Sequence, residues 1–226
     1  MKYSIFFMHN YLNCKVDLSS ITNCVRKGNF AGVRALVTGG TSVNFQTETG
    51  ETPAIYCCCF GECEILKFLL QNGANAELAN KYGSPLSWAA VHGQTACIVV
   101  LLAHGVLLDA VNLLGETALW KASMRGHLAI VKLLVDAGAD PNRADNDGKT
   151  PRAIATDRGR GASLFSDDTE RCRAAVAKFL DPKELNWRRR FPLAAVVQSV
   201  KGAPTLNNAM QVLQCNDMAR EIGSFL

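Results

Sequence analysis

Residues 126–151 read GHLAIVKLLVDAGADPNRADNDGKTP, a helical stripe followed by a polar, turn-forming segment. Apolar residues at 128, 130, 131, 133, 134 and 135 follow the helical period, which predicts an amphipathic helix after Gly126. Gly138 stands where a left-handed C-cap would end that helix. Further on, the Thr150 hydroxyl can cap a new helix, and Pro151 can occupy its first position. The stretch therefore predicts a helix, a polar loop and the start of another helix.

This pattern recurs along the chain with a period of 32 or 33 residues. The turn glycines are Gly28, Gly61, Gly93, Gly126 and Gly159, and the cap glycines are Gly40, Gly73, Gly105 and Gly138. The helix starts read TGETPAIYCC (49–58), YGSPLSWAA (82–90), LGETALWKA (114–122) and DGKTPRAIA (147–155). The single short step reflects a residue missing between Gly83 and Pro85. A fixed period of this size indicates stacked helix pairs, none of which can bury its apolar face alone.

These units resemble ankyrin repeats, and residues 126–151 are nearly the consensus form. The resemblance covers about residues 17–180, with units near 17–47, 48–79, 80–111, 112–144 and 145–180. It implies an all-α ankyrin-repeat solenoid of helix–turn–helix pairs, with β-hairpin loops projecting at right angles. We expect residues 1–16 to form an N-terminal segment and residues 181–226 a helical C-terminal extension.

Two units depart from the pattern. The first lacks the Thr-Pro start, which suits an N-terminal cap of the stack. The fifth is interrupted by RGASLFSDDTE (160–170) before its second helix, RCRAAVAKFL (171–180). We interpret the interruption as a solvent loop, with SDDTE capping the resumed helix.

Four of the nine cysteines lie within seven positions: Cys57, Cys58, Cys59 and Cys63. A helix directs the first three about 100° apart, so they cannot converge on one metal ion. The resemblance places Cys57 and Cys58 in columns of small packing residues, and Cys59 on the concave face. We expect no metal site, and Cys59 stays open as an exposed contact or a reactive thiol.

No catalytic pattern stands out. The sequence has no P-loop, no G-x-S-x-G and no dinucleotide-binding glycine motif after a strand. His92 and His127 flank turn glycines, and the resemblance gives His127 a packing and hydrogen-bonding role. We predict no enzyme activity, no cofactor and no small-molecule substrate.

The composition is that of a globular protein, with 226 residues, of which 48% are apolar and 19% charged. No apolar run approaches the roughly 20 residues of a membrane span, so we expect no membrane. Nine cysteines without a clear export signal favour a reducing compartment, so we expect the cytoplasm, with the nucleus as the alternative. Residues 149–190 hold eleven basic and six acidic residues. We interpret this stretch as a solvated face and expect no nucleic-acid partner.

The resemblance assigns binding positions to the loop tips and to the ends of the first helices. The predicted partner-binding residues are Phe60, Tyr82, His92, Leu113, Leu114, Met124, Arg125 and Arg158. Paired leucines at a loop tip would give an apolar centre with charged surroundings. The alternative is that the two leucines pack under a neighbouring loop or beneath the VLL of the third unit (106–108). The chain is thus predicted to be a non-catalytic protein-binding module, a scaffold or adaptor.

The last residues allow a second hypothesis. CNDMAREIGSFL (215–226) is similar to the opening helix of an F-box, and its place after ankyrin repeats is similar to that of a cullin-adaptor box. The alternative function is therefore a ubiquitin-ligase substrate adaptor. The simpler interpretation is that the extension caps the end of the stack.

Overall fold

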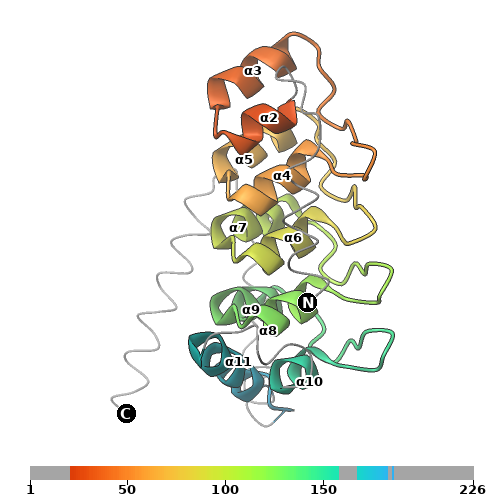
Figure 1. The fold of residues 1–226 in the computed structure, drawn as a ribbon, viewed down its shortest axis with the longest axis vertical. Helices are drawn as coiled ribbons and strands as arrows, with labels where there is room; N and C mark the ends of the chain where they lie inside the picture. The colour runs from red at the N-terminus through yellow and green to blue at the C-terminus, as the bar shows by residue number, and fades with distance from the viewer. Residues whose placement is uncertain (1–20, 158–166, 183–184, 186–226) are drawn as a thin grey trace.

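The computed structural model describes residues 21–157, 167–182 and 185. These residues form paired helices stacked in chain order (Figure 1). The helices are α2 (Ile21–Arg26), α3 (Phe30–Thr38), α4 (Pro53–Phe60), α5 (Cys63–Gln71), α6 (Pro85–His92), α7 (Thr95–His104), α8 (Ala118–Arg125), α9 (Leu128–Asp136), α10 (Pro151–Thr156) and α11 (Asp167–Phe179).

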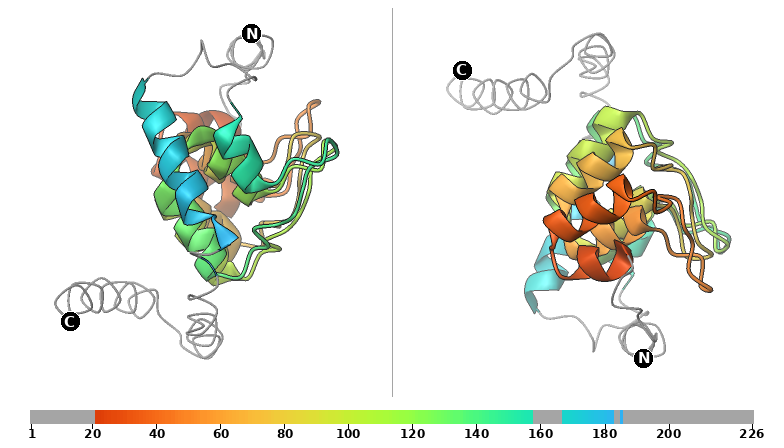
Figure 2. Two further views of the ribbon diagram at one scale, coloured as in Figure 1. Left: turned by 90° about the horizontal axis from the view of Figure 1, so that it is seen from below. Right: turned by 90° about the horizontal axis from the view of Figure 1, so that it is seen from above.

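The helices form two layers. The first helix of each pair packs against the first helices of the neighbouring pairs, so that α2, α4, α6, α8 and α10 make an inner layer. The helices α3, α5, α7, α9 and α11 make the outer layer. The loops that join successive pairs project away from the helices on one side of the stack (Figure 2). The predicted all-α solenoid is confirmed.

Local sequence sets the ends of the inner helices. A Thr or Ser side chain accepts a backbone N–H at the start of four of them: Thr52, Ser84, Thr117 and Thr150. Glycines in the left-handed conformation end three of them, namely Gly61, Gly93 and Gly126, with φ of 80°, 73° and 77°. The predicted caps Thr52, Ser84 and Thr150 and the helix ends at Gly61, Gly93 and Gly126 are therefore confirmed, and Thr117 caps α8 although no proline follows it.

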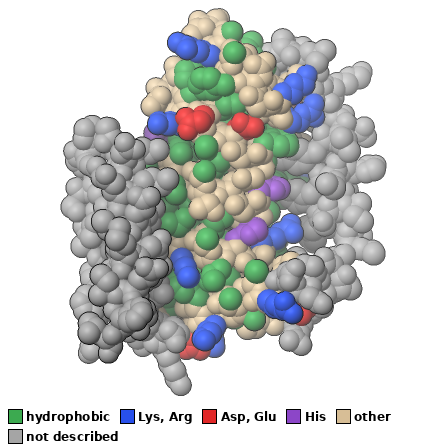
Figure 3. All heavy atoms as spheres, turned by 90° about the vertical axis from the view of Figure 1, so that its left-hand side faces the viewer, with side chains coloured by type: hydrophobic (Ala, Val, Ile, Leu, Met, Phe, Trp, Pro, Cys, Tyr) green, Lys and Arg blue, Asp and Glu red, His purple; other side chains and the backbone are tan. Residues whose placement is uncertain are grey.

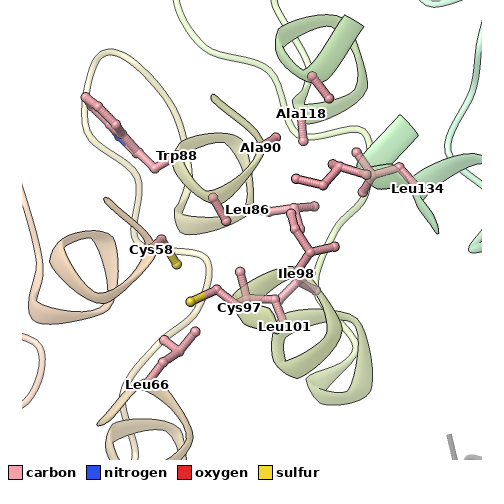
Figure 4. Close-up of a cluster of buried hydrophobic side chains, with 14 of the residues drawn as sticks. Cys58, Leu66, Leu86, Trp88, Ala90, Cys97, Ile98, Leu101, Ala118 and Leu134 are labelled. Carbon is pink, nitrogen blue, oxygen red and sulfur yellow. The ribbon is translucent and has the colours of Figure 1, made fainter. Parts of the chain in front are cut away.

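The core lies between the two layers, and small residues let the inner helices approach closely. Cys57 and Cys58 are fully buried, as are Ala89 and Ala90 in the next inner helix. In Figure 4 the sulfur of Cys58 faces that of Cys97, near Leu86 and Ile98. The interpretation of Cys57 and Cys58 as packed small residues is confirmed.

The expected β-hairpins are wrong over the described residues, where one isolated bridge joins Asn80 and Gly83. The other loops close through a single backbone pair at their base, for example Asn112 N–H to the Glu116 carbonyl at 3.2 Å. Too few residues flank each closure for a ladder to extend. The loop at Asn80 closes one residue sooner than the others because of the missing residue after Gly83.

Side-chain acceptors link each loop to the next one. Asn44 accepts the N–H of Asn75 at 2.7 Å, and Glu77 accepts the N–H of Leu107 at 2.8 Å. Asp109 accepts the N–H of Asp140 at 3.1 Å. The three acceptors differ in type but occupy equivalent positions, and each binds a backbone group about one repeat further along the chain.

The last pair departs from the predicted boundaries. The helix α10 ends at Thr156 rather than at the turn of Gly159, and α11 begins at Asp167 rather than at Arg171. Acidic residues suit the first turn of a helix, so residues 167–170 extend α11 instead of preceding it. The buried guanidinium of Arg173 donates to the carbonyls of Ile154 and Asp157, both at 2.7 Å. It closes the end of α10 in place of a glycine cap.

Several predictions lie outside the described residues. These are the N-terminal segment 1–16, residues 160–166 of the interruption, and nearly all of the extension 181–226 with its F-box-like end.

Two loop glycines provide a matched test of contact between loops. Gly115 (φ 76°) and Gly148 (φ 79°) share the left-handed conformation. A Cβ on Gly115 would lie 2.8 Å from the backbone N of Asn146, whereas one on Gly148 would meet nothing within 4 Å. We expect Gly148→Ala to lower the free energy of unfolding by about 1 kcal/mol from backbone strain alone, and Gly115→Ala by about 2–3 kcal/mol. Urea unfolding measures both, and equal losses would contradict the contact.

Candidate functional site

The predicted binding residues fall into two groups. Tyr82, Leu113 and Leu114 lie on the loops, while Phe60, His92, Met124 and Arg125 lie at the C-terminal ends of inner helices. Arg158 lies outside the described residues. An inner helix of eight residues separates the groups, a distance of about 12 Å.

The loop group exposes two leucines. The side chains of Leu113 and Leu114 are 75% and 50% exposed. The alternative that they pack under a neighbouring loop is therefore wrong. Their backbone is nevertheless fixed, because Asn146 donates its N–H to the Leu114 carbonyl and its side-chain amide to the Leu113 carbonyl, both at 3.0 Å. The structure thus presents two apolar side chains on a held loop.

An aromatic row connects the two groups. The Tyr82 ring meets the Trp88 ring edge-on at 6.4 Å, and Trp88 stacks on the His92 ring at 5.8 Å with 7° between the planes. The Trp88 Nε1–H donates to Asn80 Oδ1 at 3.2 Å. In Figure 4 Trp88 points away from the labelled core side chains. Trp88 was not among the predicted residues, although its place one turn before the predicted His92 was a usable signal.

The neighbouring inner helices repeat this pair one turn apart. In α4, Tyr56 stacks on Phe60 at 6.2 Å. In α8 the equivalent pair is Lys121 and Arg125. The side chains at these two equivalent positions thus change from aromatic to basic along the stack, and Trp88 and Lys121 among them are buried.

Lys121 has a structural role. It is buried, lies 3.8 Å from Glu116 Oε2 and donates to the Tyr82 carbonyl. Burial lowers the pKa of Lys121, and Glu116 opposes that shift. Lys121 therefore joins its own repeat to the shortened loop of the preceding one.

Three groups form what we name the basic cluster: His92, Arg125 and His127. The His127 Nε2–H donates to the Val91 carbonyl at 3.2 Å, in agreement with its predicted hydrogen-bonding role. Burial lowers the pKa of His92, and the neighbouring Arg125 and His127 lower it further. Burial also lowers the pKa of His127, against the hydrogen bond to Val91. Figure 3 shows histidine side chains beside a basic side chain, with the visible acidic side chains nearer the two ends of the stack.

The comparisons with known proteins identify the repeat. A family model described as Ankyrin repeats (3 copies) matches residues 21–112, and one described as Ankyrin repeats (many copies) matches residues 101–155. The chain belongs to the ankyrin repeat family. Ankyrin repeats are generally protein–protein interaction modules, and ankyrin repeat homologues are typically non-catalytic.

Relatives of this ankyrin repeat chain include proteins of different sizes. The human ankyrin repeat domain-containing protein 63 is 33% identical over 76% of this chain and 42% of its own length. The ankyrin repeat protein YahD of Escherichia coli K12 is 30% identical over 58% of this chain and 68% of its own. A Caenorhabditis briggsae ankyrin repeat and KH domain-containing protein is 30% identical over 66% of this chain and 6% of its own. The chain thus spans only a small part of its larger relatives.

The structure corrects the placement of Cys59 in the ankyrin stack. Cys59 is only 9% exposed, so its expected exposure on the concave face is wrong. It packs with the core cluster instead. Burial raises the pKa of the Cys57 and Cys58 thiols well above the ordinary value, which keeps them protonated.

Thiol labelling should follow this burial. We expect a maleimide to modify the exposed Cys172 in the native protein, and to reach Cys57, Cys58 and Cys97 only after unfolding. Peptide mapping by mass spectrometry distinguishes the sites. Native labelling of Cys58 or Cys97 at the rate of Cys172 would contradict the buried arrangement.

Two further properties concern the described part of the chain. Within residues 21–157, 167–182 and 185, no group of three or more His, Cys, Asp or Glu side chains is placed to hold a metal ion. Across the same ranges, no helix has the length and apolar character to cross a membrane.

Proposed function

We propose that this ankyrin repeat chain is a non-catalytic module that binds a protein partner through its loop tips and inner-helix ends. The observation that carries the proposal is the exposure of Leu113 and Leu114 on a loop whose backbone is fixed. Exposed apolar side chains with polar surroundings are typical of protein interfaces.

The fixed loop backbone favours the affinity for a partner, in addition to exposing the two leucines. The Asn146 bonds hold the backbone of Leu113 and Leu114 before any partner arrives, so binding orders less of the chain. Tyr82 and His92 lie at opposite ends of α6, and the buried ring of Trp88 contacts both of them. A partner that covers the leucines therefore meets the basic cluster when it extends along α6.

The sequence also supports a proposed location and a proposed role for the protein. The nine cysteines favour a cytoplasmic or nuclear location, where thiols stay reduced. A role as scaffold or adaptor agrees with a binding surface and no catalytic pattern.

Partner identification tests the function. The full chain is used to capture proteins, and direct binding of the strongest candidate is then measured with purified components. The double variant Leu113→Ser/Leu114→Ser is expected to bind it at least about tenfold more weakly. Leu107→Ser is the matched control, because Leu107 is 66% exposed but lies outside the proposed binding surface.

Unfolding midpoints of both variants should equal that of the original chain, since all three side chains are exposed. Unchanged binding by the double variant, or equal loss by Leu107→Ser, would overturn the proposed surface.

A further inference from the structure

Arg125 forms no ion pair with any of the described residues. It is the last residue of α8 and is half-buried. Its Nε is buried with no hydrogen-bond partner, and none of the ion pairs among the described residues includes it. A buried donor left unpaired costs free energy, which a suitably placed acceptor would recover.

The acidic groups that precede α8 and follow α10 pair with other cations. Glu116 lies beside Lys121, and Asp157 forms an ion pair with Lys149. Burial lowers the pKa of Arg125, and no acidic neighbour opposes that shift. Among the described residues, no carboxylate therefore forms an ion pair with Arg125.

The surroundings combine this charge with apolar surface. Met124 is half-buried beside Arg125, and His92 lies on the Trp88 ring in the adjacent repeat. An arginine fork binds carboxylate and phosphate groups through two parallel hydrogen bonds. The pKa values of His92 and His127 are both lowered, so both are neutral at neutral pH and the cluster carries one positive charge. One positive charge matches a carboxylate better than a phosphate group of nearly two negative charges.

We propose that Arg125 binds an Asp or Glu side chain of an acidic protein segment, and that an apolar residue next to this acid packs beside His92 and Met124. The inference rests on the proposed function, because the acidic segment belongs to the protein partner. It adds the chemistry by which that partner is recognised.

Selection from a library of short random peptides tests the inference without a known partner. The library is selected on the full chain, on Arg125→Gln and on Arg143→Gln. Arg143 is the matched control because it is an exposed arginine on a loop, and its replacement removes the same charge. We expect sequences with Asp or Glu beside an apolar residue on the original chain and on Arg143→Gln, but not on Arg125→Gln.

Affinity measurements then use the best selected peptide and its Asn or Gln analogue. The analogue should bind the original chain about tenfold more weakly, and the two peptides should bind Arg125→Gln equally. Arg125→Lys keeps the charge but loses the planar guanidinium. It should retain part of the difference in affinity between the acidic peptide and its analogue. If Arg125→Gln does not fold, the analogue on the original chain and Arg125→Lys still decide the result.

The outcomes separate the inference from the proposed function. Selected peptides without acidic residues, or acidic peptides that bind Arg125→Gln equally well, would overturn the inference and leave the protein-binding function standing. A phosphoserine analogue that binds more tightly than the acidic peptide through Arg125 would overturn the carboxylate assignment. The absence of any binding peptide, together with no captured protein, would overturn both.

Discussion

Replacing Trp120 by alanine is expected to lower the free energy of unfolding by about 3–5 kcal/mol. Trp120 is a helix α8 residue only 2% exposed. Its Nε1–H donates to the Lys149 carbonyl at 3.1 Å, so the side chain joins its own repeat to the next loop. Alanine would remove the ring and leave this carbonyl without its donor. Chemical denaturation followed by circular dichroism measures the loss.

Trp120→Phe separates the two contributions. Phenylalanine retains most of the apolar volume but has no N–H, so we expect a loss of about 1–2 kcal/mol. An alanine variant as stable as the phenylalanine variant would contradict the packing role. If hydrogen exchange showed a loss of amide protection only in α10 and α11, the repeats would separate at this position.

Replacing Arg173 by methionine should lower the free energy of unfolding by about 2–4 kcal/mol. Arg173 is 5% exposed, and its guanidinium holds the carbonyls of Ile154 and Asp157. Methionine fills much of the same space but leaves both carbonyls without this donor. Because the contact joins α10 to α11, hydrogen exchange should rise in these two helices first.

Arg173→Lys is the control for this second prediction. Lysine keeps the charge near the end of α10 but cannot place one planar group against two carbonyls, so an intermediate loss is expected. If methionine and lysine variants were as stable as the original, the guanidinium would not be the cap of α10.

The repeat and its helix ends were predictable because they depend on neighbours in sequence. A Thr or Ser before the first turn and a glycine after the last one act within a few residues, so period and caps agree with the structure. The stripe after Gly126 likewise predicts α9 within its observed bounds, Leu128–Asp136.

The features that were predicted wrongly, or not predicted at all, depend on contacts between residues far apart in the chain. Cys59 is buried because its helix packs between neighbouring inner helices, which its own position does not reveal. The end of α10 depends on Arg173, and the row through Trp88 depends on the closure of the shortened loop near Asn80. That Arg125 has no ion-pair partner among the described residues follows only from the ion pairs that Glu116 and Asp157 form elsewhere.

The hydrogen bonds accepted by Asn44, Glu77 and Asp109 affect how ankyrin repeat chains can gain or lose whole repeats. Each acceptor recognises a backbone N–H, which every residue except proline provides. A duplicated or transplanted repeat therefore needs no matching side chain on the receiving loop to be joined there. Growth or loss of whole repeats can leave this connection intact while the exposed tip residues diverge.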